Sequence, residues 1–100
     1  MTGAIIRHVV VRGRVQGVGY RAFVEQEAHR RALHGWVRNR RDGSVEAVFA
    51  GPSAAVESMV DACRRGPMSA RIIALDHREG TEADLLEGAE GDSFSVLPTI

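Results

Sequence analysis

The sequence predicts an α+β sandwich in which strands and helices follow the order βαββαβ, with an antiparallel sheet and two helices on one face. Three observations favour this class. Short runs are rich in β-branched residues, two longer segments carry apolar residues at helical spacing, and glycine or proline separates the segments. The 100 residues, 44% of them hydrophobic, suffice for one small core, so we expect a single domain over residues 1–100.

The first strand and the first helix are indicated by two different periodicities. Residues Ile5 to Arg12 are rich in Ile and Val, and their alternation places Val9 and Val11 toward the core. A helix is expected from about Tyr20 to Leu33, because apolar residues recur there at helical spacing. The members of this stripe are Tyr20, Phe23, Val24, Ala28 and Ala32.

A hairpin follows the first helix. Residues His34 to Arg40 and Ser44 to Ala50 form its two strands, and Arg41-Asp42-Gly43 is typical of a tight connecting turn. We therefore expect these two strands to be antiparallel neighbours in the sheet.

The second helix is bounded by residues that begin and end helices. Ser53 is a suitable N-cap, and Gly66-Pro67 supplies a glycine for the C-terminal end followed by a helix breaker. The apolar stripe between them consists of Val56, Met59, Val60 and Cys63. Its spacing indicates core packing, so Cys63 is interpreted as a buried small hydrophobe and not as a reactive thiol.

The last third of the chain contains two strands separated by an acidic stretch. The strands cover Ala70 to His77 and Ser93 to Leu97, and the second places Phe94 and Val96 on one face. The stretch between them is expected to be a surface loop with a helical turn around Ala83 to Glu87. The complete order of elements is typical of the ferredoxin-like arrangement.

A glycine-rich run, Gly13-Arg14-Val15-Gln16-Gly17-Val18-Gly19-Tyr20-Arg21, lies between the first strand and the first helix. Glycines allow a tight turn that exposes backbone N–H groups, and the start of the helix favours an anion. Arg21 adds a permanent charge with donors in a fixed fork. These features indicate a phosphate cradle, although a glycine-rich turn that only links strand to helix has the same composition.

Two other phosphate motifs and a metal site are excluded or disfavoured. The chain has no lysine, which rules out the GxxxxGK[ST] loop, and GxGxxG lacks its third glycine and the acidic residue about 20 positions later. The histidines have no metal-ligand spacing such as HExxH. They are His8, His29, His34 and His77. Glu25 and Glu27 are interpreted as solvated charges on the helix and not as a catalytic pair.

Charge is distributed unevenly along a chain whose formal net charge is zero. The half that contains the cradle carries an excess of arginine, and the second half carries an excess of acidic residues. This asymmetry favours an anionic ligand near the loop. Arg38, Arg40 and Arg41 could extend this field, but such residues are usually just exposed.

A second motif, Gly35-Trp36-Val37-Arg38-Asn39, follows the helix. Together with the run from Gly13 to Arg21, it resembles the acylphosphatase family, whose signature pairs a G-x-V-Q-G-V-x-[FY]-R loop with a G-W-V-x-N strand. The resemblance continues through Asp42-Gly43-Ser44-Val45-Glu46 and Gly66-Pro67 and reaches Phe94. It implies the ferredoxin-like fold and the hydrolysis of acyl phosphates to a carboxylate and inorganic phosphate.

The resemblance also implies roles for individual residues. Arg21 matches the family's catalytic arginine, which grips the phosphoryl oxygens, and Asn39 matches the asparagine that holds the attacking water. The expected phosphate-binding residues are Gln16, Gly17, Val18, Gly19, Tyr20 and Arg21, with no metal and no cofactor. A purely structural role for Asn39 at the end of its strand is the alternative. Arg40-Arg41 departs from what many family members have after the asparagine, which could alter substrate preference.

The expected partner is therefore a small acyl phosphate. We expect no membrane contact, because the apolar runs are far shorter than the roughly 20 residues of a spanning helix. RNA binding is disfavoured, because the five aromatic residues are scattered. A lone cysteine and the lack of a secretion signal favour the cytoplasm, and we expect a monomer. An anion-binding domain without turnover is the alternative function.

Overall fold

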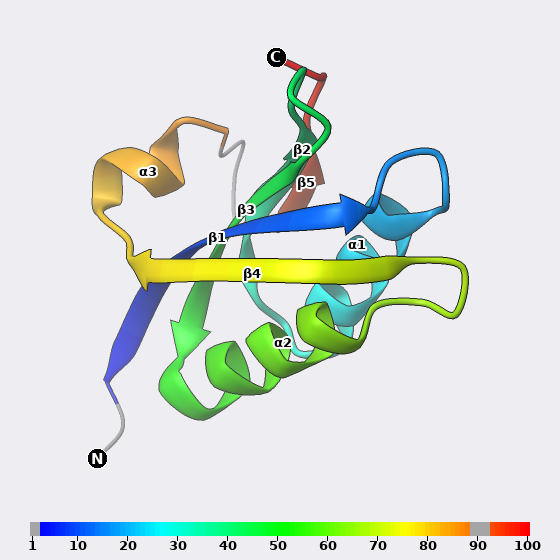
Figure 1. The fold of residues 1–100 in the computed structure, drawn as a ribbon. Coiled ribbons are helices and arrows are strands. Elements are labelled where there is room, and N and C mark those ends of the chain that lie inside the picture. The colour runs from blue at the N-terminus through cyan, green and yellow to red at the C-terminus, as the bar shows by residue number, and fades with distance from the viewer. Residues whose placement is uncertain (1–2, 89–92) are drawn as a thin grey trace.

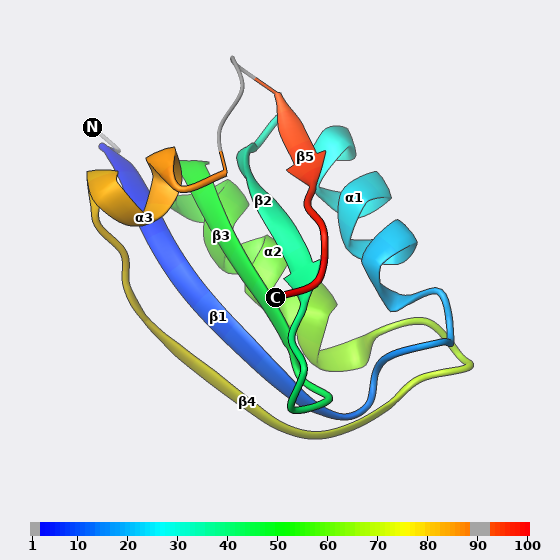
Figure 2. The same ribbon diagram turned by 90° about the horizontal axis from the view of Figure 1, so that it is seen from above.

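A computed structural model describes residues 3–88 and 93–100. Two long helices pack on one face of a five-stranded sheet, and a short third helix lies on the other face (Figures 1 and 2). The elements follow the order β1 (Ala4–Arg14), α1 (Tyr20–Arg30), β2 (His34–Asn39), β3 (Val45–Pro52), α2 (Ser53–Arg65), β4 (Arg71–Glu79), α3 (Glu82–Leu86) and β5 (Phe94–Val96). The predicted ferredoxin-like arrangement is confirmed.

The sheet was predicted to be antiparallel, but it is mixed. Its strand order is β4-β1-β3-β2-β5, in which the first four strands pair antiparallel and β5 pairs parallel with β2. Strand β4 ends at Glu79, opposite Arg7, at the end of the sheet where β2 begins. The chain crosses the sheet there through α3, so β5 starts beside the start of β2 and runs in the same direction (Figure 2).

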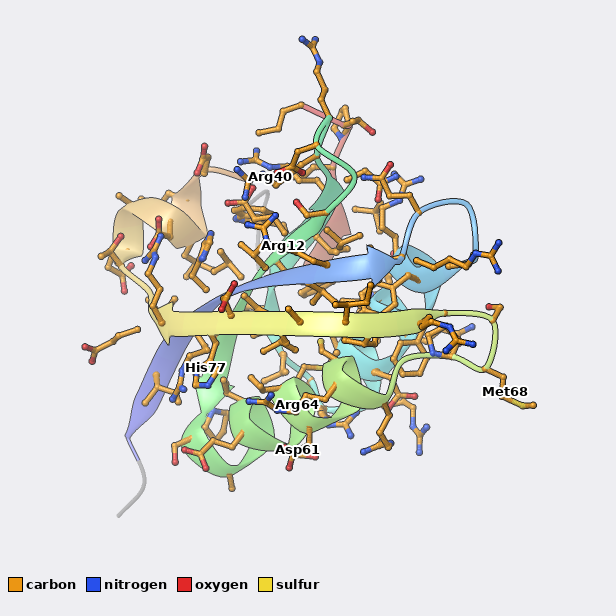
Figure 3. All side chains as sticks on the ribbon, in the orientation of Figure 1. Arg12, Arg40, Asp61, Arg64, Met68 and His77 are labelled. Atoms are coloured by element: carbon orange, nitrogen blue, oxygen red, sulfur yellow. The ribbon has the colours of Figure 1, made fainter. Side chains whose placement is uncertain are left out.

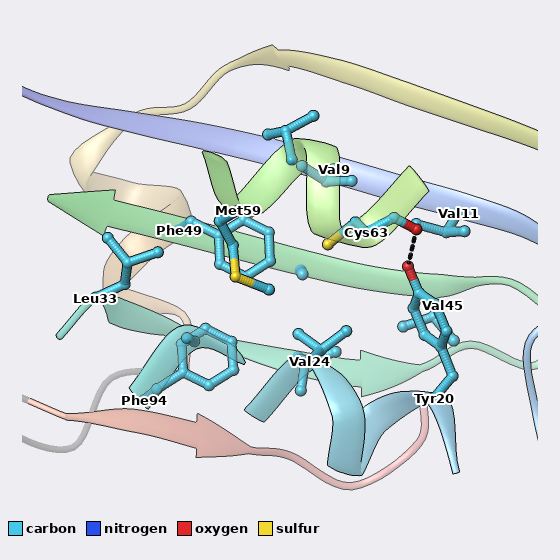
Figure 4. Packing of buried hydrophobic residues seen from close by; sticks show 14 of the residues in the cluster. Val9, Val11, Tyr20, Val24, Leu33, Val45, Phe49, Met59, Cys63 and Phe94 are labelled. Carbon is cyan, nitrogen blue, oxygen red and sulfur yellow. Dashed lines mark hydrogen bonds between the residues drawn. The ribbon is translucent and has the colours of Figure 1, made fainter. Parts of the chain in front are cut away.

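The core lies between the helices and the sheet (Figure 4). Val9 and Val11 belong to it, as the alternation along β1 predicted, and so does the whole predicted stripe of α2. Cys63 is 1% exposed, and burial raises the pKa of its thiol to about 12, which keeps it protonated and unreactive. On the opposite side of α2, Asp61 and Arg64 are exposed (Figure 3).

Helix α1 is shorter than predicted. It ends at Arg30, and Ala32 takes a left-handed backbone conformation with φ 54° and is exposed, so its assignment to the buried stripe was wrong. The N–H of Leu33 donates to the carbonyl of Ala28 at 3.0 Å, which closes the turn and buries Leu33 before β2 begins. At the other helix, Ser53 is the first helical residue and its side chain makes no capping hydrogen bond, contrary to prediction.

The predicted helical turn in the acidic stretch is α3. Thr81 caps it by accepting from the N–H of Asp84, and the Asp84 carboxylate accepts from the N–H of Thr81 in return. The last part of that stretch, residues 89–92, lies outside the described residues. No helix in the described part of the chain is long and apolar enough to cross a membrane.

Arg38 is buried, contrary to the prediction of an exposed charge. Its guanidinium lies 4.5 Å from the centre of the Trp36 ring and pairs with Glu46 at 2.9 Å. Burial opposes the charge on Glu46, but hydrogen bonds with His8 and Arg38 outweigh it and lower the pKa of that carboxyl. Trp36 Nε1 donates to the carbonyl of Asp84, so α3 covers this polar cluster. The cluster lies on the face of the sheet opposite α1 and α2.

Candidate active site

The loop between β1 and α1 depends on glycine for its backbone conformation. Gly17 has φ 74° and Gly19 has φ 80°, values that other residues adopt only with strain. A Cβ atom at either position would meet nothing within 4 Å, so the requirement comes from the backbone and not from lack of space. The hydroxyl of Ser69 donates to the carbonyl of Val18 at 2.7 Å. This hydrogen bond connects the loop to the turn that joins α2 to β4.

Helix α1 begins directly after this loop, and no described side chain neutralises the positive end of the helix there. Gly19 is the N-cap, no side chain caps the helix, and the first turn contains no acidic residue. The first N–H groups of a helix have no partner within the helix and form its positive end. This terminus is therefore equipped to bind an anion.

Tyr20 anchors the same terminus to α2. Its ring is 1% exposed, and its hydroxyl donates to the carbonyl of Cys63 at 2.8 Å (Figure 4). Burial is the main reason that the pKa of the Tyr20 hydroxyl lies far above its ordinary value. The side chain of Tyr20 is thus part of the core. Only the backbone of this residue can contact a ligand bound at the loop.

Asn39 is the last residue of β2 and is 9% exposed. Its Oδ1 is buried and accepts no hydrogen bond from any described residue. A buried acceptor of this kind is rare, because desolvation without a hydrogen bond is unfavourable. The backbone of Asn39 is fixed by the β2–β3 ladder, in which Asn39 pairs with Val45.

A single hollow of about 400 Å³ brings these features together. Of the residues expected to bind phosphate or water, it is lined by Gly17, Gly19, Tyr20, Arg21 and Asn39. Gln16 and Val18 do not line it. No acidic side chain of the described residues forms an ion pair with Arg21. Arg21, the N-terminal residues of α1 and Asn39 therefore line the same hollow.

The whole chain resembles known proteins in both sequence and structure. The acylphosphatase family model matches residues 7–94. An acylphosphatase of Rhodopseudomonas palustris strain BisB18 is 58% identical over 96 residues, which are 96% of this chain and 97% of that protein. The crystal structure of acylphosphatase from Bacillus subtilis has a TM-score of 0.80 at 38% identity, with 93% of this chain and 98% of the other covered.

The chain belongs to the acylphosphatase family. It is accordingly a hydrolase that acts on acyl phosphates, which are small-molecule substrates. A structure of an acylphosphatase from Coxiella burnetii gives the same fold, with a TM-score of 0.82 at 29% identity over 94% of this chain and 93% of the other.

Four further residues line the hollow of this acylphosphatase-family chain without having been assigned to it from the sequence. They are Val15, Ala22, Glu25 and Val96. Glu25 was interpreted as a solvated charge, but it follows Arg21 by four residues and therefore lies on the same face of α1. That spacing was the available signal. Val96 belongs to β5, which was predicted as a strand, but no motif or spacing connected that strand with the loop.

The described residues contain no group of three or more His, Cys, Asp or Glu side chains that could hold a metal ion. Glu27, the other acidic residue noted on α1, pairs with Arg31 at 2.7 Å and with Arg30 at 3.1 Å. Hydrogen bonds from Arg31 are the main cause of the lowered pKa of its carboxyl.

Proposed function

We propose that Arg21 and the backbone amides around Gly17 to Tyr20 hold the phosphoryl group of an acyl phosphate, while Asn39 holds the attacking water. The observation that supports these roles is the buried, unpartnered Oδ1 of Asn39 on the same hollow as Arg21 and the free N-terminus of α1. Asn39 lines the hollow, and an amide oxygen that has no protein donor can accept a hydrogen bond from a water molecule bound there, which keeps a lone pair for attack.

The reaction needs little acid–base assistance. Water attacks phosphorus, the bond between phosphorus and the acyl oxygen breaks, and a carboxylate leaves with the bonding electrons. The conjugate acid of that carboxylate has a pKa of about 4, if it resembles Asp or Glu, so no general acid has to protonate it. The proton of the water passes to a phosphoryl oxygen, since an amide is too weak a base to accept it.

Catalysis then rests on charge and position. Charge spreads over the phosphoryl oxygens in the transition state, where the guanidinium of Arg21 and the N–H groups bind them most strongly. The water on Asn39 is held at a fixed place relative to the phosphorus, which lowers the entropic part of the barrier. We propose that one chain suffices for this chemistry and that neither a nucleic acid nor a metal takes part. The cytoplasmic location stays a prediction.

The test is phosphate release from a small synthetic acyl phosphate with chelator present. Arg21→Ala is expected to lose a factor of about 10²–10³ or more in rate, which is typical for removal of an oxyanion donor. Arg21→Lys should recover little, because an ammonium does not reproduce the bidentate fork. The matched control is Arg14→Ala, since Arg14 is exposed at the end of β1 and does not line the hollow.

Two results would contradict the proposal. A folded Arg21→Ala variant that keeps most of its activity would remove the assigned role of Arg21. A folded wild-type chain that binds phosphate without hydrolysing any acyl phosphate would favour the anion-binding alternative.

A further inference from the structure

The side chain of Gln16 does not line the hollow, yet it makes two well-defined contacts. Its Nε2 donates to the carbonyl of Arg40 at 2.7 Å and to the carbonyl of Ser44 at 2.9 Å. A side-chain amide has two N–H donors, so both are used. Gln16 immediately precedes Gly17, which places this double contact at the start of the cradle loop.

The two carbonyls that Gln16 binds are the ones that close the β2–β3 turn. The N–H of Arg40 donates to the carbonyl of Ser44 at 2.9 Å, and the N–H of Gly43 donates to the carbonyl of Arg40 at 3.1 Å. Asn39 directly precedes Arg40 and ends β2. A link to these carbonyls is therefore a link to the strand end that positions the Asn39 amide.

Other links between the cradle loop and this turn are weak. Backbone pairing of β1 with β3 ends where Val11 lies opposite Val45. Within the part of the chain that the structure describes, no backbone hydrogen bond joins residues 13–19 to residues 40–44. Arg12 and Asp42 form an ion pair at 3.5 Å, but both side chains are about half exposed, and such pairs contribute little.

We propose that Gln16 is a positioning residue that fixes the cradle relative to Asn39, and thereby aligns the attacking water with the phosphorus. This inference rests on the proposed roles of Arg21 and Asn39. Its physical basis is that a misplacement of about 1 Å between reacting groups can lower a rate by a factor of about 10². The side chain of Gln16 would contribute to the rate without touching substrate.

Gln16→Ala is expected to lower kcat by a factor of about 10 to 10² while inorganic phosphate inhibits with nearly unchanged affinity. The cradle amides and Arg21 remain in this variant, so the phosphate site persists. Retained phosphate affinity also shows that the variant is folded. The matched control is Gln26→Ala, because Gln26 is the other glutamine of the chain, is exposed on α1, and should leave kcat unchanged.

A double-variant cycle separates positioning from a general structural role. If Gln16 acts through Asn39, then Gln16→Ala should change kcat by less than about twofold when Asn39→Ala is already present. If the double variant instead loses kcat by the product of the two single-variant factors, the inference about Gln16 is overturned. An Asn39→Ala variant that keeps full kcat would instead overturn the proposed function, so the two failures are distinguishable.

Gln16→Glu supplies an independent signature. A carboxylate cannot donate to the two carbonyls, and their oxygens should hold its pKa above the ordinary value of about 4.3. The protonated form can donate one hydrogen bond, so the kcat of Gln16→Glu relative to wild type should rise as the pH falls from about 8 to about 5. A ratio that does not change with pH, or a variant as active as wild type at every pH, would overturn the inference.

Discussion

Tyr20→Phe removes one hydroxyl from the core and keeps the aromatic ring. The carbonyl of Cys63 lies in the last turn of α2, where carbonyls have no partner within the helix, and Pro67, four residues on, has no N–H to donate. The hydroxyl of Tyr20, buried with its ring, supplies the missing donor at 2.8 Å. Without it, a carbonyl at the end of α2 loses its partner inside the core.

The expected loss of stability follows from this geometry. Leaving a buried acceptor unsatisfied costs about 1–3 kcal/mol of unfolding free energy. For a domain of this size, each kcal/mol lowers Tm by about 4–8 °C, so Tyr20→Phe should lower Tm by roughly 4–24 °C. Activity at a temperature where the variant is folded should stay within about twofold, because the first turn of α1 and Arg21 keep their places.

Urea unfolding and a thermal scan measure this prediction, with phosphate release as the functional readout. An unchanged m-value shows that the denaturant midpoint reports stability alone. A Tm within about 2 °C of wild type would refute the reasoning, since it would mean that the Cys63 carbonyl finds another donor without cost. Wild-type stability combined with lost activity would mean that the hydroxyl acts in the site and not in the core.

Three further outcomes are expected. Glu25→Gln should tighten phosphate binding by up to about fivefold, because it removes a negative charge from the hollow, and added salt should reduce the difference. Ser69→Ala should weaken phosphate binding while Ser69→Thr retains it. Met68→Ala serves as its control, because Met68 is fully exposed on the same turn (Figure 3). Hydrogen bonds from Ser44 and from Arg78 are the main causes that lower the pKa of Asp42 and of Asp84, respectively, to about 2. Stability measured by urea unfolding should therefore fall as the pH drops from about 4 toward about 2, and a flat profile there would contradict these contacts.

Local patterns in the sequence predicted the second helix, the hairpin and the glycine-rich loop. The stripe of α2, the β2–β3 turn and the glycine-rich loop depend on interactions between residues close in sequence, so their composition is sufficient to identify them. The conformations of Gly17 and Gly19 agree with the turn that the glycines indicated. Arg21 and Asn39 were identified by motif, and the structure brings both to one hollow.

The features that the sequence did not reveal depend on contacts between distant segments. Arg38 packs on Trp36 and pairs with Glu46 on the face of the sheet that α3 covers, and nothing near Arg38 in the sequence indicates that cover. Strand β5 was predicted near Ser93 to Leu97, but its parallel pairing with β2 was not, because its direction depends on where the chain crosses the sheet. The contacts of Gln16 join residues 24 and 28 positions apart.

The most direct test of the central assignment compares phosphate affinity and single-turnover hydrolysis in Asn39→Ala and Arg21→Ala. If Asn39 holds water and Arg21 holds phosphate, Asn39→Ala should lose most of its hydrolytic rate while inorganic phosphate binds almost as in wild type. Arg21→Ala should lose both. Both variants must show native circular dichroism, because Asn39 ends a strand of the sheet. An equal loss of phosphate affinity in the two folded variants would contradict the account, since it would make Asn39 part of the phosphate cradle.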